Sequence, residues 1–214
     1  MNKEFFTRIL SSLILLPIVL FFIIKGSIFF NFLILVILLI TLYEWHYLSL
    51  SKIYYLPGFI FIIFSFYTFY FLRNDENLTF FLLTLLICVA TDIGGYIFGK
   101  TLKGPKLSKI SPNKTYAGVF GGFVLSIIFA SIFLNNLIFF SLEEFDKDIG
   151  FQIIFIVLSI SFISQMGDLL ISFCKRQSMI KNTGKIIPGH GGVLDRIDGM
   201  IFAFPHAYLL IKFI

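Results

Sequence analysis

The sequence has few of the residues from which soluble proteins and common catalytic sites are built. Only 14% of its 214 residues are charged, while 58% are hydrophobic and 30 are phenylalanine. So little charge excludes an ordinary water-soluble domain and indicates an integral membrane protein. Two cysteines, Cys88 and Cys174, are too few for a disulfide framework. The three histidines are scattered and predict no zinc site, and no Ser-His-Asp arrangement can be read from the chain.

The apolar residues fall into seven runs of membrane-spanning character. We predict an all-α, polytopic integral membrane protein that forms a single transmembrane domain over residues 1–214, with N-terminal spans in 1–77 and a motif-bearing part in 78–214. The first run is interpreted as a retained helix, not a cleaved signal peptide, because further spans follow it. The seven spans are expected at residues 9–24, 28–50, 56–72, 78–98, 116–134, 151–173 and 197–213.

The lysines and arginines divide unequally between the two sets of loops that seven spans create. Thirteen of the 17 belong to the N-terminus, Lys52 and the loops 100–115 and 175–196, and four lie on the other side. Because cytoplasmic loops carry the excess of cations, we expect these loops in the cytoplasm and the protein in the cell (inner) membrane. The arrangement predicts a polar cavity that faces the cytoplasm. It also accounts for the net charge of +5 without a nucleic-acid partner.

Two aspartates lie inside apolar runs. Asp92 and Asp168 come near the ends of the spans 78–98 and 151–173. A carboxylate in the membrane is costly unless it is paired or hydrated, so both residues are functional candidates. For Asp92, an alternative is a side chain that simply reaches into the lipid headgroups.

A third acidic residue, Glu44, lies near the end of the span 28–50. Its neighbours Tyr43, Trp45 and Tyr47 fit an aromatic belt at the membrane interface. We therefore interpret Glu44 as an interfacial residue, with a buried polar site as the alternative.

The longest polar stretch of the chain runs from 172 to 198. It combines lysines and arginines with a glycine-rich turn around His190 and the carboxylates Asp195 and Asp198. Glycines in the turn allow positive φ angles and a close approach of the backbone to a ligand. Asp195 and Asp198 would share one face of a helix. Cations beside carboxylates suggest phosphate together with a divalent metal, because the cations bind phosphate and the carboxylates bind metal.

The expected site contains oxygen ligands, cations and hydroxyl groups. Carboxylates suited to Mg²⁺ are supplied by Asp168, Asp195, Asp198 and Asp92. Phosphate could be neutralised by Lys114, Lys175, Arg176, Lys181 and Arg196, with hydroxyls from Ser111 and Thr115. Phosphoryl or nucleotidyl transfer needs mainly positioning and charge neutralisation, which this set provides. A cytoplasmic opening would admit a nucleotide, and the membrane would supply a lipid acceptor.

These residues together resemble the signature of a known enzyme family. The stretch reads Ser172-x-x-Lys175-Arg176, then Lys181, then Pro188-Gly189-His190-Gly191-Gly192-x-x-Asp195-Arg196-x-Asp198. Upstream, the segments 92–99 and 110–115 and the triplet 167–169 agree with it. This pattern resembles the phosphatidate cytidylyltransferases, also called CDP-diacylglycerol synthases. The motifs cover about the C-terminal half of the chain, whereas the N-terminal spans resemble the family only in hydropathy.

The resemblance implies the reaction of CTP with phosphatidate to give CDP-diacylglycerol and pyrophosphate, with Mg²⁺ as cofactor. It implies that Asp168 and Asp195 hold the metal, that Asp198 supports them, and that Lys175 and Arg176 complete the catalytic set. The expected partners are CTP, phosphatidate and membrane lipids; a homodimer stays open, and nucleic acid is not expected. Substrate contacts are predicted for Ser111, Lys114, Thr115, Lys181, His190, Gly191, Gly192, Arg196 and Asp92.

Three positions depart from the family pattern. Asn182 follows Lys181 where the family usually has an acidic residue, and Ala117 and Ile171 also replace acidic residues. The three aspartates of the main motifs remain, so the enzyme interpretation is kept. Two alternative classes are a related CTP-dependent kinase or transferase acting on a polyprenol or another lipid, and a transporter for an anionic solute.

Overall fold

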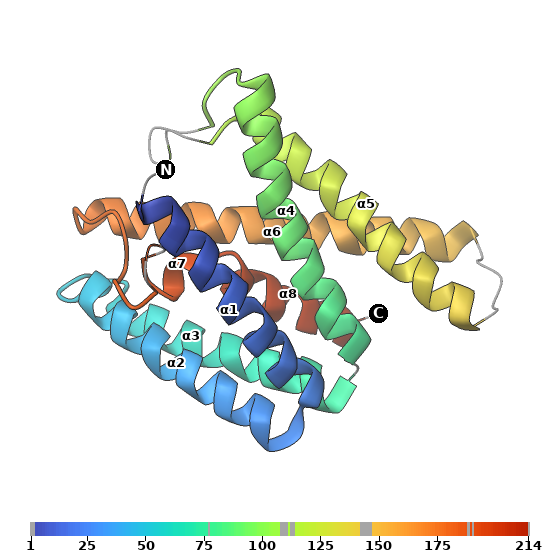
Figure 1. Ribbon diagram of the computed structural model, residues 1–214, viewed down its shortest axis with the longest axis horizontal. Helices are drawn as coiled ribbons and strands as arrows, with labels where there is room; N and C mark the ends of the chain where they lie inside the picture. The colour runs from blue at the N-terminus through green and yellow to red at the C-terminus, as the bar shows by residue number, and fades with distance from the viewer. Residues whose placement is uncertain are drawn as a thin grey trace. The chain divides into compact units, whose positions relative to one another are not determined.

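A computed structural model describes the backbone of residues 3–76, 78–107, 111, 114–141, 147–187, 189 and 191–213. Within these residues the chain is helical and contains no strand beyond two isolated bridges, Lys106 with Thr115 and Ile187 with Gly191 (Figure 1). The predicted all-α class is therefore confirmed. The chain divides into two compact units: unit 1 comprises Met1–Leu78 and Cys174–Asp198, and unit 2 comprises Thr79–Phe173 and Gly199–Ile214.

Unit 1 is built from the N-terminal helices and the later polar segment Cys174–Asp198. Its elements are α1 (Lys3–Lys25), α2 (Ser27–Ser49), α3 (Tyr55–Phe71), the π-helical turn η1 (Leu72–Glu76), the last turn of α6 (Lys147–Gln177) and the short α7 (Leu194–Ile197). Arg73 of η1 donates to the carbonyl oxygens of Ile23 at 2.7 Å and of Ile24 at 3.2 Å. Because the last carbonyls of a helix lack partners within it, Arg73 stabilises the end of α1.

Trp45 joins α2 to α3. Its indole N–H donates to the carbonyl oxygen of Tyr55 at 3.1 Å, and only 4% of the residue is exposed. A Cβ atom on Gly58 would lie 1.9 Å from the indole ring, so the glycine is what lets the ring pack there. The aromatic-belt interpretation is therefore wrong for Trp45, which is a core residue of unit 1; its neighbours Tyr43 and Tyr47 are exposed.

Unit 2 contains α4 (Leu78–Leu102), α5 (Tyr116–Ser141), α6 as far as Phe173, and α8 (Met200–Phe213). The helices α4 and α5 approach each other through glycines. A Cβ atom on Gly94 would lie 2.3 Å from the carbonyl oxygen of Gly121, and one on Gly118 would lie 2.8 Å from that of Gly95. The small residues at the start of α5 thus allow close packing of helices, as the sequence indicates.

Two contacts connect α4 to the other helices of unit 2. The hydroxyls of Thr91 on α4 and Ser161 on α6 are buried and lie 2.7 Å apart. Near the start of α4, the ring of Phe81 packs edge-on against Phe204 of α8, with centroids 5.0 Å apart. Both pairs are buried, so they belong to the core of this unit.

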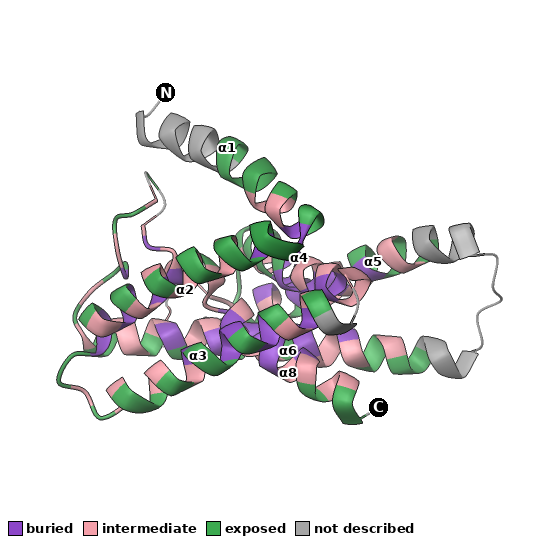
Figure 2. Cartoon of the chain, turned by 90° about the horizontal axis from the view of Figure 1, so that it is seen from below, coloured by how far each residue is buried: buried purple, intermediate pink, exposed green. Residues whose placement is uncertain are grey.

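The first six predicted runs lie largely in α1 to α6, one run in each helix, and the last run, 197–213, contains α8. Among the described residues, five helical segments are long and apolar enough to cross a membrane: Ser27–Ser49, Tyr55–Asn74, Leu78–Leu102, Tyr116–Asn135 and Phe151–Gln177. The apolar segments Leu13–Lys25 and Met200–Phe213 are shorter. Large apolar side chains such as Phe32 and Leu39 of α2 are exposed, which suits a lipid-facing surface. Figure 2 shows exposed positions along α2 and α3. The chain is therefore a multi-pass membrane protein.

The C-terminal end of α6 lies four residues beyond the predicted end of the sixth span. The helix continues to Gln177, so Lys175 and Arg176 lie on its last turn and not in a loop, which corrects the sequence interpretation. Met179, at φ +57°, ends it: its N–H bonds to the carbonyl of Arg176, and the N–H of Ile180 bonds to that of Lys175. These two bonds form a Schellman motif. Its positive-φ position is usually glycine but is Met179 here, so the sequence gives no sign that the helix ends at this point.

The polar segment before the last helix also differs from expectation. The predicted span 197–213 is divided, because Ile197 ends the short α7 and α8 begins at Met200. Gly199 separates the two helices, and a Cβ atom there would lie 2.5 Å from Oγ of Ser164. Asp195 therefore lies on a short helix of its own and does not begin the last span.

Candidate active site

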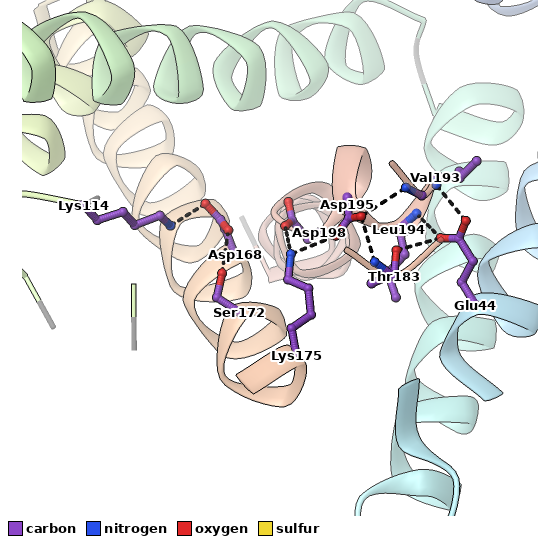
Figure 3. A network of polar contacts seen from close by, with 11 residues as sticks. Glu44, Lys114, Asp168, Ser172, Lys175, Thr183, Val193, Leu194, Asp195 and Asp198 are labelled. Carbon is purple, nitrogen blue, oxygen red and sulfur yellow. Dashed lines mark hydrogen bonds and ion pairs between the residues drawn. The ribbon is translucent and has the colours of Figure 1, made fainter. Parts of the chain in front are cut away.

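Lys175 lies between two carboxylates in unit 1. Its ammonium group donates to Oδ1 of Asp195 at 2.9 Å and lies 3.9 Å from Oδ2 of Asp198 (Figure 3). The three side chains are mostly buried, with 9–13% of each exposed. The structure thus brings together three of the predicted catalytic residues. Carboxylate oxygens of this kind are ligands that Mg²⁺ accepts.

Asp195 is fixed by backbone groups as well as by Lys175. Its Oδ2 atom accepts the N–H groups of Thr183 at 2.9 Å and of Gly192 at 3.1 Å. Burial acts to raise the pKa of the Asp195 carboxyl, but the bonds from Lys175, Thr183 and Gly192 outweigh burial and lower that pKa below its ordinary value. Asp195 is therefore ionised at neutral pH.

The donor set in unit 1 is chemically compatible with Mg²⁺. A carboxylate oxygen has two acceptor positions, and among the described residues Oδ1 of Asp195 accepts only from Lys175. Mg²⁺ is usually held by one or two carboxylates, with substrate phosphates and water completing its octahedron. In the described part of the chain, no three His, Cys, Asp or Glu side chains gather into a ready-made ligand set. Phosphate oxygens would therefore have to supply part of the coordination.

A second lysine–carboxylate pair lies in unit 2. The ammonium group of Lys114 forms an ion pair with Oδ2 of Asp168, and the hydroxyl of Ser172 donates to Oδ1 of Asp168 at 3.3 Å. The Lys114 and Asp168 side chains are 28% and 27% exposed. This pair connects the basic loop before α5 with α6. Because both side chains are partly exposed, they remain accessible to a ligand.

The two predicted hydroxyl residues lie in or beside that basic loop. Thr115 precedes α5, and its Oγ1 atom accepts the N–H of Gly118 at 3.1 Å, which is the bond of an N-cap residue. The N–H of Leu107 bonds to the carbonyl of Lys114 at 2.8 Å and holds the two ends of the loop together. Ser111 is described between them and is partly exposed.

The remaining predicted site residues are mainly on the surface of their units. Asp92, Arg176, Lys181 and Arg196 are exposed, as groups that meet a soluble or lipid phosphate need to be. His190 lies outside the described residues. The structure of each unit therefore gives these residues access, without assigning a role to any of them.

The glycine-rich turn has two kinds of glycine. Gly189 and Gly191 adopt positive φ angles of +75° and +94°, as the sequence predicts for such a turn. The N–H groups of Ile187 and Gly191 each bond to the carbonyl of the other residue and close the turn. Gly192 is different: a Cβ atom there would lie 2.1 Å from Oγ1 of Thr183 and 2.5 Å from Oε2 of Glu44.

Glu44 is the residue that the sequence interpretation misplaced. It is 1% exposed, and its carboxylate accepts bonds from Thr183, Val193 and Leu194 (Figure 3). The preferred interfacial interpretation is therefore wrong, and the alternative, a buried polar site, is confirmed. The one signal in the sequence was the rarity of a carboxylate inside an apolar helix.

The fold and the site define a class of protein. A multi-pass membrane protein carries a buried lysine between two carboxylates, and a second lysine–carboxylate pair lies beside a basic loop. Such groups suit phosphate and a divalent cation, which is the chemistry of membrane-embedded phosphoryl and nucleotidyl transferases.

Comparison with known proteins gives the family. Residues 51–214 match the cytidylyltransferase family, and the chain belongs to it. A phosphatidate cytidylyltransferase of Rickettsia felis is 34% identical over 212 residues, which cover 98% of this chain and 93% of that protein. A phosphatidate cytidylyltransferase of Brucella suis is 40% identical over 141 residues, covering 64% of this chain and 49% of that protein. The chain thus spans about half the length of the Brucella relative and nearly all of the Rickettsia one. The resemblance seen in the sequence is confirmed.

Proposed function

We propose that the protein transfers the cytidylyl group of CTP to phosphatidate and so forms CDP-diacylglycerol and pyrophosphate. The observation that carries the proposal is the similarity, over 98% of the chain, to a phosphatidate cytidylyltransferase. The site agrees with this function, because Lys175, Asp195 and Asp198 lie together within the segment that matches the family. Phospholipid biosynthesis is the process that this reaction serves.

In the proposed reaction, a phosphate oxygen of phosphatidate attacks the α-phosphorus of CTP. A new P–O bond forms there, and the bond from the α-phosphorus to the oxygen that bridges it to the β-phosphate breaks. Pyrophosphate leaves with the electron pair of the broken bond, and no side chain needs to act as a covalent nucleophile. The tasks of the protein are to align the two substrates and to neutralise their phosphates.

The site residues divide between these two tasks. We propose that Asp168 and Asp195 hold one Mg²⁺ ion, supported by Asp198; the ion would supply charge neutralisation at the phosphates. Lys175 keeps Asp195 oriented and, with Arg176 and Lys181, would bind phosphate oxygens. The remaining predicted substrate contacts are Ser111, Lys114, Thr115, His190, Gly191, Gly192, Arg196 and Asp92.

We further propose that seven helices cross the cell membrane and that the polar residues line a cavity facing the cytoplasm. The support is the division of the cations, 13 of 17 on the side that carries both basic loops. A cytoplasmic opening would give CTP access, while phosphatidate would enter from the membrane. The helices α1 (Lys3–Lys25) and α8 (Met200–Phe213) would be the first and last spans.

Purified protein in detergent tests the function directly. CTP and Mg²⁺ are supplied with phosphatidate, with a polyprenol or without lipid, and pyrophosphate and the lipid product are measured. The proposal predicts pyrophosphate release that depends on phosphatidate and equals the CDP-diacylglycerol formed. Turnover with the polyprenol alone would point to the related lipid kinases or transferases, and an absence of CTP turnover with every lipid would favour a transporter.

A further inference from the structure

Glu44 of α2 is a buried carboxylate that the proposed chemistry does not use. Its Oε1 atom accepts the N–H of Val193 at 3.0 Å, and its Oε2 atom accepts the Thr183 hydroxyl at 2.9 Å and the N–H of Leu194 at 2.8 Å. None of the ion pairs between described residues involves it. Burying a carboxylate without hydrogen-bond donors costs free energy. The donors of Thr183, Val193 and Leu194 therefore compensate the burial of Glu44.

The polar segment is shaped to receive this carboxylate. A Cβ atom on Gly184 would lie 2.5 Å from Oε1 of Glu44, and one on Gly192 would lie 2.5 Å from Oε2. Neither glycine has a positive φ angle, so their backbone conformation would accept another residue. Glycine is required at position 184 by the space that Glu44 occupies, and at position 192 by the space that Thr183 and Glu44 occupy.

The contacts of Glu44 lead directly to Asp195. Thr183 bonds to both carboxylates, with its hydroxyl to Glu44 and its backbone N–H to Asp195. The consecutive residues Gly192 and Val193 also bond to the two carboxylates. The N–H of Gly192 bonds to Asp195, and the N–H of Val193 bonds to Glu44. Glu44 therefore fixes the two chain segments whose N–H groups hold Asp195.

The same helix also anchors the other half of the Lys175–Asp195 pair. Just after the end of α6, the hydroxyl of Ser178 donates to the carbonyl oxygen of Leu48 on α2 at 2.6 Å. One turn of α2, from Glu44 to Leu48, thus holds both the end of the helix that carries Lys175 and the segment that carries Asp195.

We propose that Glu44 is a positioning residue for Asp195: it holds residues 183–194 in the conformation in which Asp195 can serve the reaction. This inference rests on the proposed function for its catalytic consequence. Its structural part concerns the order of the segment and can be measured without any substrate.

The test compares Glu44→Gln with Thr41→Val on the same helix. Glutamine has the shape of glutamate, but its NH₂ group cannot accept the bonds that one carboxylate oxygen accepts. Thr41 is also buried, yet its hydroxyl donates only to the carbonyl of Ile37 within α2, at 2.7 Å, so its loss should leave residues 183–194 unchanged. Thermal unfolding of both variants reports whether they are folded.

The first measurement is amide hydrogen exchange of the full-length protein in detergent, without CTP or Mg²⁺. Glu44→Gln should speed exchange in peptides covering 183–194 by about tenfold or more, and should leave α3 unchanged. Thr41→Val should not change exchange in 183–194. Equal exchange of 183–194 in wild type and Glu44→Gln would overturn the proposal, as would faster exchange spread evenly over α2, α3 and this segment.

The second measurement is kinetic. Glu44→Gln should lower kcat by about 10- to 100-fold, because a small displacement of a catalytic group is sufficient for such a loss. It should also raise the Mg²⁺ concentration needed for half-maximal rate, with a smaller change in the KM for CTP. Wild-type kcat and Mg²⁺ dependence in a folded Glu44→Gln protein would contradict a positioning role.

Thr183 supplies a milder pair of variants if Glu44→Gln does not fold. Thr183→Val removes one of the three donors to Glu44, whereas Thr183→Ser keeps the hydroxyl, and both retain the N–H that bonds to Asp195. We expect Thr183→Val to speed exchange and lower kcat, and Thr183→Ser to resemble the wild type. Identical behaviour of the two would refute the proposal. If the wild type turns over no CTP, the proposed function fails, while the exchange data still decide whether Glu44 orders the segment.

Discussion

At the scale of single residues, the charge of Lys175 is already partnered inside the protein. Its ammonium group bonds to Asp195 and lies near Asp198, with 12% of its side chain exposed. Arg176, the next residue, is exposed. The two neighbouring cations of the motif therefore have different surroundings, and their substitution should have different consequences.

Both Lys175→Ala and Arg176→Ala should lower turnover, and Lys175→Ala should lower stability more, because Lys175 is mostly buried and Arg176 is exposed. Removing one partner of a mostly buried ion pair costs about 3–5 kcal/mol, since Asp195 would lose the cation that bonds to it. For each variant the loss of a charged phosphate contact predicts a decrease in kcat/KM of about 10- to 100-fold. Thermal unfolding in detergent and steady-state kinetics provide the measurements, with Lys175→Arg as the charge-preserving control. Equal stability of the Lys175→Ala and Arg176→Ala variants would show that the ion pair contributes nothing.

Asp168→Asn and Asp195→Asn test the proposed metal. If both residues hold Mg²⁺, each variant should require at least about tenfold more Mg²⁺ for half-maximal rate and lose most of its turnover at saturation. The alternative is that each aspartate serves only its lysine, Lys114 or Lys175. In that case the variants should lose stability and keep the wild-type Mg²⁺ titration, a result that would remove the residue from the metal site.

The sequence identifies the site residues that belong to a motif, but not the residue whose role depends on tertiary contacts. Lys175, Asp195 and Asp198 could be found because their spacing in the sequence is distinctive. Glu44 could be recognised as unusual, but its partners Thr183 and Val193 lie 139 and 149 residues further along the chain. A single sequence does not indicate which segment returns to a given helix, so the interfacial interpretation was chosen and was wrong.

At the scale of elements, the close packing of α4 on α5 depends on individual glycines. Gly94 is buried and faces the carbonyl oxygen of Gly121. Its neighbour Gly95 has more room, since a Cβ atom there would lie 3.8 Å from the nearest atom, the carbonyl oxygen of Gly118. The pair provides a matched comparison within one helix.

Gly94→Ala should destabilise the protein and Gly95→Ala should not. The added methyl group at 94 forces the two backbones apart, an overpacking that costs about 1–3 kcal/mol. At 95 the methyl group makes an ordinary contact, and alanine favours the helix by up to about 1 kcal/mol. Thermal unfolding of the two variants in the same detergent measures the difference. A Gly94→Ala protein as stable as Gly95→Ala would show that α4 and α5 do not pack through these glycines.

The helices themselves were predictable, but some of their ends were not. Among the described residues, hydrophobic runs located every α-helix except the short α7, because an apolar membrane segment has to satisfy its backbone within a helix. The end of α6 was placed too early because Met179, which adopts a positive φ angle, is a residue that gives no stop signal. The break between α7 and α8 was not predicted. Gly199 separates the two helices and packs against Ser164 of α6, a tertiary contact that the sequence does not indicate.

At the scale of the whole molecule, the proposed active site requires both basic loops to lie on one side of the membrane. The loops 100–115 and 175–196 carry ten of the 17 lysines and arginines. The predicted acidic loop, 135–150, is shorter in the structure, because α5 continues to Ser141 and α6 begins at Lys147; residues 142–146 lie outside the described part of the chain. Seven crossings would place this loop opposite the two basic ones.

Single cysteines at Lys103 and Asp146 test that topology. Each cysteine is introduced separately into a variant in which Cys88 and Cys174 have been replaced by alanine. Cells that express each variant are treated with an impermeant thiol reagent, either intact or after permeabilisation. Lys103→Cys should be labelled only after permeabilisation, and Asp146→Cys before it. Lys52→Cys, expected on the cytoplasmic side, is the control. Labelling of positions 103 and 146 from the same side would contradict the seven-span arrangement.

The central claim is that the α-phosphate of CTP, with its cytidine, is what reaches the lipid. Purified protein is incubated with phosphatidate and Mg²⁺, and with CTP labelled either at the α- or at the γ-phosphate; Asp195→Asn serves as the inactive control. Cytidylyl transfer predicts that the α-label enters the lipid product and that the γ-label appears only in pyrophosphate. Transfer of the γ-label to lipid, or no lipid labelling from either position, would contradict cytidylyl transfer.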